Sequence, residues 1–184
     1  MSPSPDEIIS IIRVTAAPGA TMGWLECGSE RFPCALGRSG IVTEKREGDG
    51  GTPVGIFPLR QLFYRQDRIA APVTHLPMTP VSPSDGWCDA PEDSAYNKPV
   101  RLPYPASAEN MWSEDHLYDL VVVLGHNDNP PIPYAGSAIF FHLAREGDDG
   151  ILQPTEGCVV LRLTDMESVL RHCGTETMMQ IEII

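Results

Sequence analysis

A cysteine and a histidine in the second half of the chain have the residue types and order of a nucleophile and its base. Cys158 follows Gly157 in the segment Pro-Thr-Glu-Gly-Cys-Val-Val, and His142 lies sixteen residues earlier, at the end of an apolar run. A thiol attacks efficiently only when a neighbouring group stabilises its thiolate or takes its proton. Gly157 has no side chain to block a carbonyl that approaches the sulfur. The pair therefore predicts acyl transfer, with His142 as the base.

This interpretation carries expectations about the surroundings of the two groups. An ion pair with His142 would lower the pKa of Cys158 and convert most of the thiol to thiolate. The backbone N–H of Cys158, with that of Gly157, is expected to form an oxyanion hole. No Asp or Asn is placed by the sequence to orient the imidazole, so a backbone carbonyl is its expected partner. The alternative is that Cys158 is a buried structural cysteine, the usual fate of this residue.

The elements that must position this pair are mostly short strands. Runs of β-favouring residues separated by Gly, Pro and Ser turns predict a mostly β, β-sandwich-like fold in a single domain over residues 1–184. Thr164 and Glu167 have capping-box spacing and predict a short helix with Thr164 as its N-cap. Residues 66–112, with eight prolines, predict a long functional or mobile loop. The predicted strands cover residues 8–15, 21–27, 31–36, 54–59, 117–124, 138–142 and 176–184.

Composition excludes several classes of partner. The formal net charge of −12 argues against broad contact with nucleic acid or an anionic membrane surface. The N-terminal residues show neither a basic start nor an apolar stretch of signal-peptide length, so we expect a cytoplasmic protein. The five cysteines are odd in number and contain no C-x-x-C, which argues against a disulfide framework. A Cys27–Cys34 bridge across a hairpin is the alternative in an oxidising compartment.

Metal and cofactor chemistry have little support in the residue pattern. His126, His142 and Cys158 could together bind zinc, but no H-x-H or H-E-x-x-H spacing supports such a site. The glycine-rich segment 48–51 lacks the Gly-Lys-Ser/Thr of a phosphate loop and is interpreted as a turn. We therefore expect neither a metal nor a cofactor.

Several motifs in order resemble the L,D-transpeptidase (YkuD-type) catalytic domain. They are Thr-Pro-Val-Gly-Ile-Phe at 52–57, Phe-His at 141–142 and Thr-Glu-Gly-Cys at 155–158. Segments 36–40, 125–128 and 136–140 are similar to a compact branch of that family without an export signal. The resemblance covers about residues 11–184.

The resemblance implies a β-sandwich-like catalytic fold and attack by Cys158 on peptidoglycan stem peptides, between a diamino acid and a following D-alanine. It implies His142 as general base and then acid, and Thr155 as a residue that positions the cysteine loop. The family usually has Arg two residues after the cysteine, where this chain has Val160. Arg162 and Arg145 are candidates to bind the substrate carboxylate, and His126 is a candidate to line the cleft.

Three functions remain open at this point. The absence of an export signal favours an L,D-carboxypeptidase that trims D-alanine from recycled muropeptides. Transfer to an amine, which would make this an L,D-transpeptidase that cross-links peptidoglycan, is the close alternative. The third is a non-catalytic module that binds peptidoglycan peptides. The presence of His142, Gly157 and Cys158 argues against it.

Overall fold

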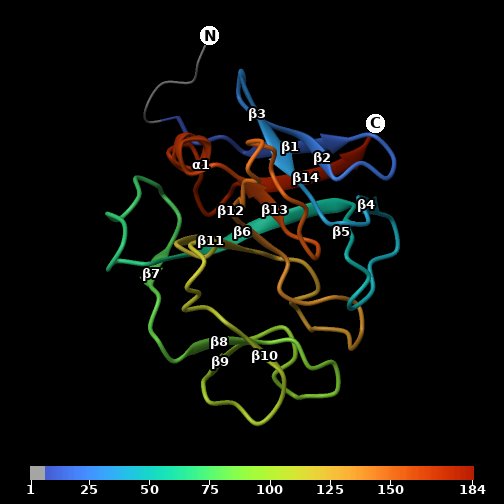
Figure 1. The fold of residues 1–184 in the computed structure, drawn as a ribbon, viewed down its shortest axis with the longest axis vertical. Coiled ribbons are helices and arrows are strands. Elements are labelled where there is room, and N and C mark those ends of the chain that lie inside the picture. The colour runs from blue at the N-terminus through green and yellow to red at the C-terminus, as the bar shows by residue number, and fades with distance from the viewer. Residues whose placement is uncertain (1–6) are drawn as a thin grey trace.

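Nine strands of the computed structural model, which describes residues 7–184, form one sheet that closes on itself (Figure 1). The strand order is β11-β12-β13-β3-β2-β1-β14-β6-β7, and β11 also pairs with β6. The strands from β11 to β6 therefore make a closed ring, with β7 added beside β6. Their bounds are β1 Ile11–Ala16, β2 Met22–Cys27, β3 Glu30–Ala35, β6 Gly55–Tyr64, β7 Met78–Pro80, β11 Leu120–Leu124, β12 Phe140–Leu143, β13 Val159–Leu161 and β14 Met178–Ile183.

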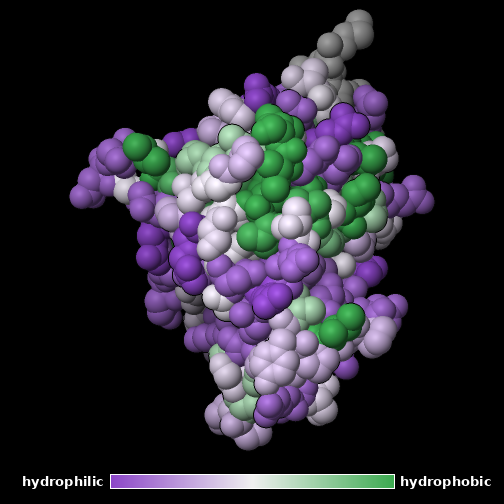
Figure 2. Space-filling view, turned by 90° about the vertical axis from the view of Figure 1, so that its right-hand side faces the viewer, coloured by the Kyte–Doolittle hydropathy of each residue, from purple (hydrophilic) through white to green (hydrophobic). Residues whose placement is uncertain are grey.

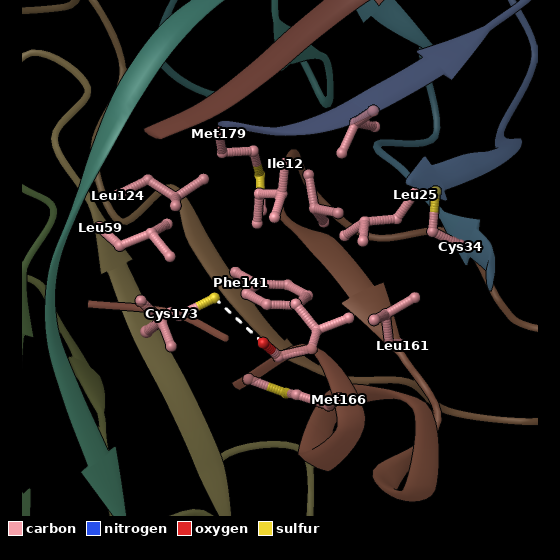
Figure 3. Close-up of a cluster of buried hydrophobic side chains, with 14 of the residues drawn as sticks. Ile12, Leu25, Cys34, Leu59, Leu124, Phe141, Leu161, Met166, Cys173 and Met179 are labelled. Carbon is pink, nitrogen blue, oxygen red and sulfur yellow. Dashed lines mark hydrogen bonds between the residues drawn. The ribbon is translucent and has the colours of Figure 1, made fainter. Parts of the chain in front are cut away.

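The inside of the ring is the main hydrophobic core. Alternate residues of each strand point inward, as the two-residue period of a strand requires, so Ile12 and Val14 of β1 are fully buried while Ile11 is exposed. Figure 3 shows side chains from opposite sides of the ring meeting around Phe141. Each fully buried Leu, Ile or Phe contributes about 1.5–3 kcal/mol relative to an exposed one. This burial holds the sheet closed.

Strands β11 and β12 are buried on both faces. All five residues of β11 and all four of β12 are buried, which fits the continuous Val-Val-Val run predicted as a central strand. Leu120, Val122 and Leu124 point into the ring, whereas Val121 and Val123 belong to a second cluster outside it. That second cluster also contains Trp87 and Cys158. Something must therefore cover the outer face of these two strands.

The covering layer comes from the segment predicted as a loop, and that prediction is wrong in part. Residues 66–112 include β7 and a separate three-stranded sheet, which lies at the bottom of Figure 1. The strands of this sheet have three or four residues and no clear alternation, so they carry almost no periodic signal. The sheet consists of β8 (Asp85–Cys88), β9 (Pro99–Arg101) and β10 (Ala108–Asn110), and a further two-stranded sheet consists of β4 (Ile41–Val42) and β5 (Thr52–Pro53).

The single predicted helix is present, but its predicted cap is wrong. Helix α1 (Leu163–Leu170) begins after Arg162, which is the N-cap residue in an extended conformation and makes no side-chain cap hydrogen bond. β13 ends at Leu161 and the chain turns directly into the helix, so Thr164 already lies in the first turn. Met166, Val169 and Leu170 are buried, and Met166 lies below Phe141 in Figure 3. The helix thus packs one apolar face against the ring, as its pattern predicts.

The other predicted strands are confirmed with small shifts of their ends. β6 continues to Tyr64, five residues beyond its predicted end at Leu59, because it pairs with both β14 and β11. All five cysteines are free and buried, so the alternative Cys27–Cys34 bridge is not formed. Residues 1–6, on which the expectation about a leader segment partly depends, lie outside the described part of the chain.

Hydrophilic and hydrophobic residues are segregated on one face of the surface. Figure 2 shows hydrophobic residues gathered in the upper half of one face, above a largely hydrophilic lower half. Neighbouring strands of the ring contribute Ile11, Trp24, Ile56 and Ile183 as exposed residues. Within residues 7–184, no helix has the length and apolarity that a membrane span would need.

Candidate active site

The parallel pairing of β12 and β13 brings Cys158 and His142 to the same face of the sheet. His142 is in register with Val160, and Phe141 with Val159. Because side chains alternate along a strand, His142, Val160 and Cys158 all leave the outer face of the ring. Cys158 and His142 both line a cavity of about 500 Å³ between the ring and the segment 66–112. The structure therefore brings the two predicted catalytic residues to one cavity.

The thiol of Cys158 is nearly enclosed and is hydrogen-bonded to the backbone at the start of β12 and just before it. Its Sγ accepts a hydrogen bond from the N–H of Phe140 at 3.3 Å and donates one to the carbonyl of Ala138 at 3.3 Å. Only 8% of the residue is exposed. Burial, together with the charge of Glu109, raises the pKa of Cys158 to about 12. The expected thiolate is therefore wrong for this state of the protein, in which the sulfur keeps its proton.

The imidazole of His142 is held by the backbone, as expected in the absence of a carboxylate partner. Its Nδ1 lies 2.9 Å from the carbonyl oxygen of Leu143, and its ring meets the edge of Tyr118 at 5.0 Å. An Nδ1–H that donates to Leu143 leaves Nε2 as an acceptor. Burial lowers the pKa of His142 to about 4, so the ring is neutral near pH 7. Within residues 7–184, no hydrogen bond joins the imidazole to the Cys158 thiol.

The turn before the cysteine is fixed by Thr155. Its hydroxyl donates to the carbonyl of Cys158 at 2.7 Å and accepts from the N–H of Gly157 at 3.1 Å. Gly157 has φ +144°, and a Cβ there would lie 2.8 Å from the carbonyl oxygen of Gly51. Only glycine fits this position without strain. Since the N–H of Gly157 already donates to Thr155, it is not available as the expected second oxyanion donor.

The two candidate arginines lie in different places. Arg145 lines the cavity and pairs with Asp115 at 2.8 Å. Arg162 does not line it, because the chain bends into α1 and the side chain instead contacts Glu146 at 3.0 Å and the carbonyl of Gly150 at 2.8 Å. Val160, the residue at the position of the family arginine, does line the cavity.

His126 also lies away from the cavity lining. Its Nε2 is 3.0 Å from the carbonyl oxygen of Ala135, and its ring packs edge-on against Phe57 at 5.4 Å. Burial lowers its pKa. His126 therefore supports the chain that leads into β12, and this packing role differs from the cleft-lining role for which it is a candidate.

Acidic residues of the cavity wall were missed by sequence reasoning. Glu109 accepts a hydrogen bond from the Tyr118 hydroxyl at 2.6 Å, and burial raises its pKa. Most of these acids come from segments without periodic pattern, so the high acidic content of the whole chain was the only available signal. Such a wall suits a substrate that carries an ammonium group. The acidic residues lining the cavity are Glu47, Asp89, Glu109, Asp115 and Glu156.

A zinc site is not assembled in the described part of the chain. Residues 7–184 contain no group of three or more His, Cys, Asp or Glu side chains arranged to hold a metal ion. Cys158 and His142 line the cavity without His126, the third ligand of the alternative zinc site.

Comparison with known proteins agrees with this geometry. Residues 14–183 match the model of the YkuD family, the L,D-transpeptidase catalytic domain. No curated protein and no solved structure matches the chain. The family match covers nearly the whole chain and includes the strands, the cysteine turn and the histidine described above. The chain therefore belongs to the L,D-transpeptidase catalytic domain family, whose members act on peptidoglycan peptides through a cysteine.

Proposed function

We propose that this protein is an L,D-carboxypeptidase that removes D-alanine from peptidoglycan-derived tetrapeptides. The observation that carries the proposal is the cavity of about 500 Å³ that both Cys158 and His142 line. A cavity of this size suits one short peptide. Because the segment 66–112 lies over the outer face of β11 and β12, we infer that water reaches the thioester more easily than a second stem peptide does.

The reaction follows from the protonation states of the pair. As the sulfur of Cys158 attacks the carbonyl carbon of the diamino acid, His142 Nε2 takes the thiol proton, which avoids a free thiolate in a buried site. The N–H of Cys158 donates to the developing oxyanion. The imidazolium then protonates the leaving nitrogen and D-alanine departs, leaving a thioester. His142 next removes a proton from water, which attacks the thioester. The imidazolium then returns this proton to the leaving sulfur, which releases the shortened peptide and regenerates the thiol.

The acidic wall and Arg145 account for substrate orientation in this proposal. The side-chain ammonium of the diamino acid would lie near Glu109, where an opposite charge offsets the cost of the buried carboxylate. Arg145 is the arginine of the cavity lining and would meet a substrate carboxylate. We further propose that the protein acts in the cytoplasm on recycled muropeptides, since five free cysteines suit a reducing compartment.

Product analysis tests the proposal directly. The protein is incubated with a disaccharide-tetrapeptide, and the products are separated and weighed by mass spectrometry. Loss of one alanine supports the proposal, whereas cross-linked dimers would identify a transpeptidase instead. Binding of the tetrapeptide with no product at all would identify a binding module.

Two variants complete the product analysis. Cys158→Ala should abolish turnover and the mass adduct of the acyl-enzyme. His142→Gln should lower kcat by about 10²- to 10⁴-fold, the usual contribution of a general base. Fractionation of cells with an antibody against the protein checks the compartment, and recovery from a periplasmic fraction would contradict the cytoplasmic role.

A further inference from the structure

The turn that leads into β12 is held at three consecutive residues by side chains from distant parts of the chain. The N–H of Gly136 donates to the hydroxyl of Tyr96 at 3.1 Å, and the hydroxyl of Ser137 donates to Glu47 at 2.8 Å. The N–H of Ala138 donates to the side-chain oxygen of Asn97 at 3.0 Å. Tyr96 and Asn97 belong to the segment 66–112, so this segment clamps the turn.

Asn97 uses its whole side-chain amide in this clamp. Its oxygen also accepts from Trp87 Nε1 at 3.0 Å, and its nitrogen donates to the carbonyls of His126 at 3.0 Å and Asn127 at 2.8 Å. The residue is 6% exposed and has φ +56°, a region that asparagine tolerates better than most residues. A buried amide whose oxygen and nitrogen each make two hydrogen bonds fixes the groups around it in one arrangement.

Ala138 connects this amide to the catalytic sulfur. Its N–H is bound by Asn97, and its carbonyl accepts the hydrogen bond of the Cys158 thiol at 3.3 Å. Ala138 has φ +53°, an uncommon conformation for a residue with a Cβ, which costs free energy unless neighbouring contacts hold it. The hydrogen bond from the Ala138 N–H to Asn97 is such a restraint. It fixes the backbone of Ala138, whose carbonyl accepts the hydrogen bond of the thiol.

We propose that Asn97 is a positioning residue for Cys158. It holds Ala138 in its strained conformation, so that the Ala138 carbonyl directs the thiol toward the cavity shared with His142. This inference rests on the proposed acyl transfer by Cys158. It also gives the segment 66–112 a role in catalysis: the segment supplies the amide that sets the position of the nucleophile.

Kinetics of Asn97→Leu test the proposal, with Tyr104→Phe as the matched control. Tyr104 lies in the same segment and makes one hydrogen bond, to Asp93 at 2.8 Å, without contact to the turn. With tetrapeptide substrate, Asn97→Leu should lower kcat by about 10- to 100-fold and change KM by less than about 3-fold. Tyr104→Phe should keep both within about twofold of the wild type. A KM effect without a kcat effect overturns the proposal.

A second measurement separates this proposal from the proposed function. Iodoacetamide labelling of Cys158 at pH 8, followed by mass spectrometry of the peptide, needs no substrate. Asn97→Leu should label at least about 3-fold faster than Tyr104→Phe, because the thiol loses the acceptor of its proton and becomes more accessible. Equal labelling rates overturn the inference, whether or not the wild type turns over the tetrapeptide.

Two further variants keep the test decisive if Asn97→Leu does not fold. Asn97→Asp keeps the acceptor oxygen for Trp87 and Ala138 but loses both donors, and it should recover at least about a third of the wild-type kcat. Trp87→Phe removes one donor to the same oxygen and should have a kcat between those of the wild type and Asn97→Leu. Thermal melts of each variant separate loss of fold from loss of positioning. A folded Asn97→Asp with a kcat as low as that of a Cys158→Ala variant contradicts the proposal.

Discussion

Cys158 and His142 are both kept uncharged by burial. The pKa of the thiol is raised to about 12 and that of the imidazole is lowered to about 4, with desolvation as the largest cause in each case. Opposite shifts of this kind favour a thiol and a neutral base over a thiolate–imidazolium pair. In the proposed reaction the thiol proton therefore moves to the imidazole during the attack on the substrate.

The first prediction follows from the raised pKa of Cys158. At pH 8 a smaller fraction is thiolate than in a free thiol with pKa near 8.5, so alkylation by iodoacetamide should be slower than that of glutathione. The rate should still be rising above pH 9. Peptide mapping by mass spectrometry follows the labelling, with Cys158→Ser as the control. A labelling midpoint below pH 8.5 would show that the imidazole stabilises a thiolate after all.

The two arginines provide a second prediction at the same scale. Arg145 lines the cavity, whereas Arg162 contacts Glu146 outside its lining. Arg145→Gln should raise KM for the tetrapeptide by about 10-fold or more, because a charge-assisted hydrogen bond to a carboxylate contributes about 1.5–3 kcal/mol. Arg162→Gln is the matched control and should leave KM within about twofold. Steady-state kinetics decide between them, and the reverse order of effects would place the substrate carboxylate near Arg162.

At the scale of elements, strands β11 and β12 depend on the segment that covers their outer face. Its two ends are tied together by Arg65, which follows β6 and is almost fully buried. The guanidinium donates to the carbonyl of Ser113 at 2.8 Å, pairs with Asp67 at 2.9 Å and lies 3.5 Å from the centre of the Trp112 ring. These contacts close the loop of residues 66–112 over the outer face of β11 and β12.

Arg65→Met should therefore loosen the covering segment. We expect a loss of about 1–3 kcal/mol in the free energy of unfolding, because the Ser113 carbonyl keeps only the hydrogen bond from Arg68 and the Trp112 ring loses its cation. Urea denaturation measures the loss, and limited proteolysis should cut within 66–112 sooner than in the wild type. The control is Arg101→Met in the same segment, whose exposed pair with Asp85 contributes less than about 1 kcal/mol. Equal losses of stability in the two variants would contradict the proposal that Arg65 ties the two ends of the segment 66–112 together.

At the scale of the whole molecule, the buried imidazole couples stability to pH. The pKa of His142 is lowered in the folded protein to about 4, from about 6.5 in the unfolded chain. Between these values the unfolded chain binds the extra proton, so the free energy of unfolding is largest above pH 6.5 and falls as the pH drops toward 4. Two and a half pKa units correspond to about 3 kcal/mol.

The fourth prediction isolates this contribution. Chemical denaturation at several pH values should show that the wild type loses about 3 kcal/mol more than His142→Gln between pH 6.5 and 4. His75→Gln, at an exposed position, is the control and should keep the wild-type slope. Identical slopes for His142→Gln and the wild type would show that the imidazole is already charged or solvated in the folded protein.

Features with a local signal could be predicted from the sequence. The apolar run of β11, the alternation of β1 and the apolar stripe of α1 each follow from the period of one element. Gly157 stood out because a glycine leaves the sulfur of Cys158 open to a carbonyl, and His142 because of its place at the end of a strand. The parallel pairing that brings His142 and Cys158 together joins β12 and β13, which are consecutive strands of the chain. The order of the family motifs in the sequence was therefore enough to predict the pair.

Features that depend on burial and long-range contacts could not be predicted in this way. The strands of 66–112 are too short to show a period, so Asn97, Glu109 and the rest of the covering layer looked like loop residues. The placement of Arg162 depends on where β13 turns into α1, which strand alternation alone does not give. Burial decides the charge of Cys158 and His142, and burial exists only once the covering layer packs on the ring. The sequence by itself thus determined which groups could react, and the tertiary structure decided their protonation states and the groups that hold them, because desolvation and hydrogen bonding act between residues far apart in the chain.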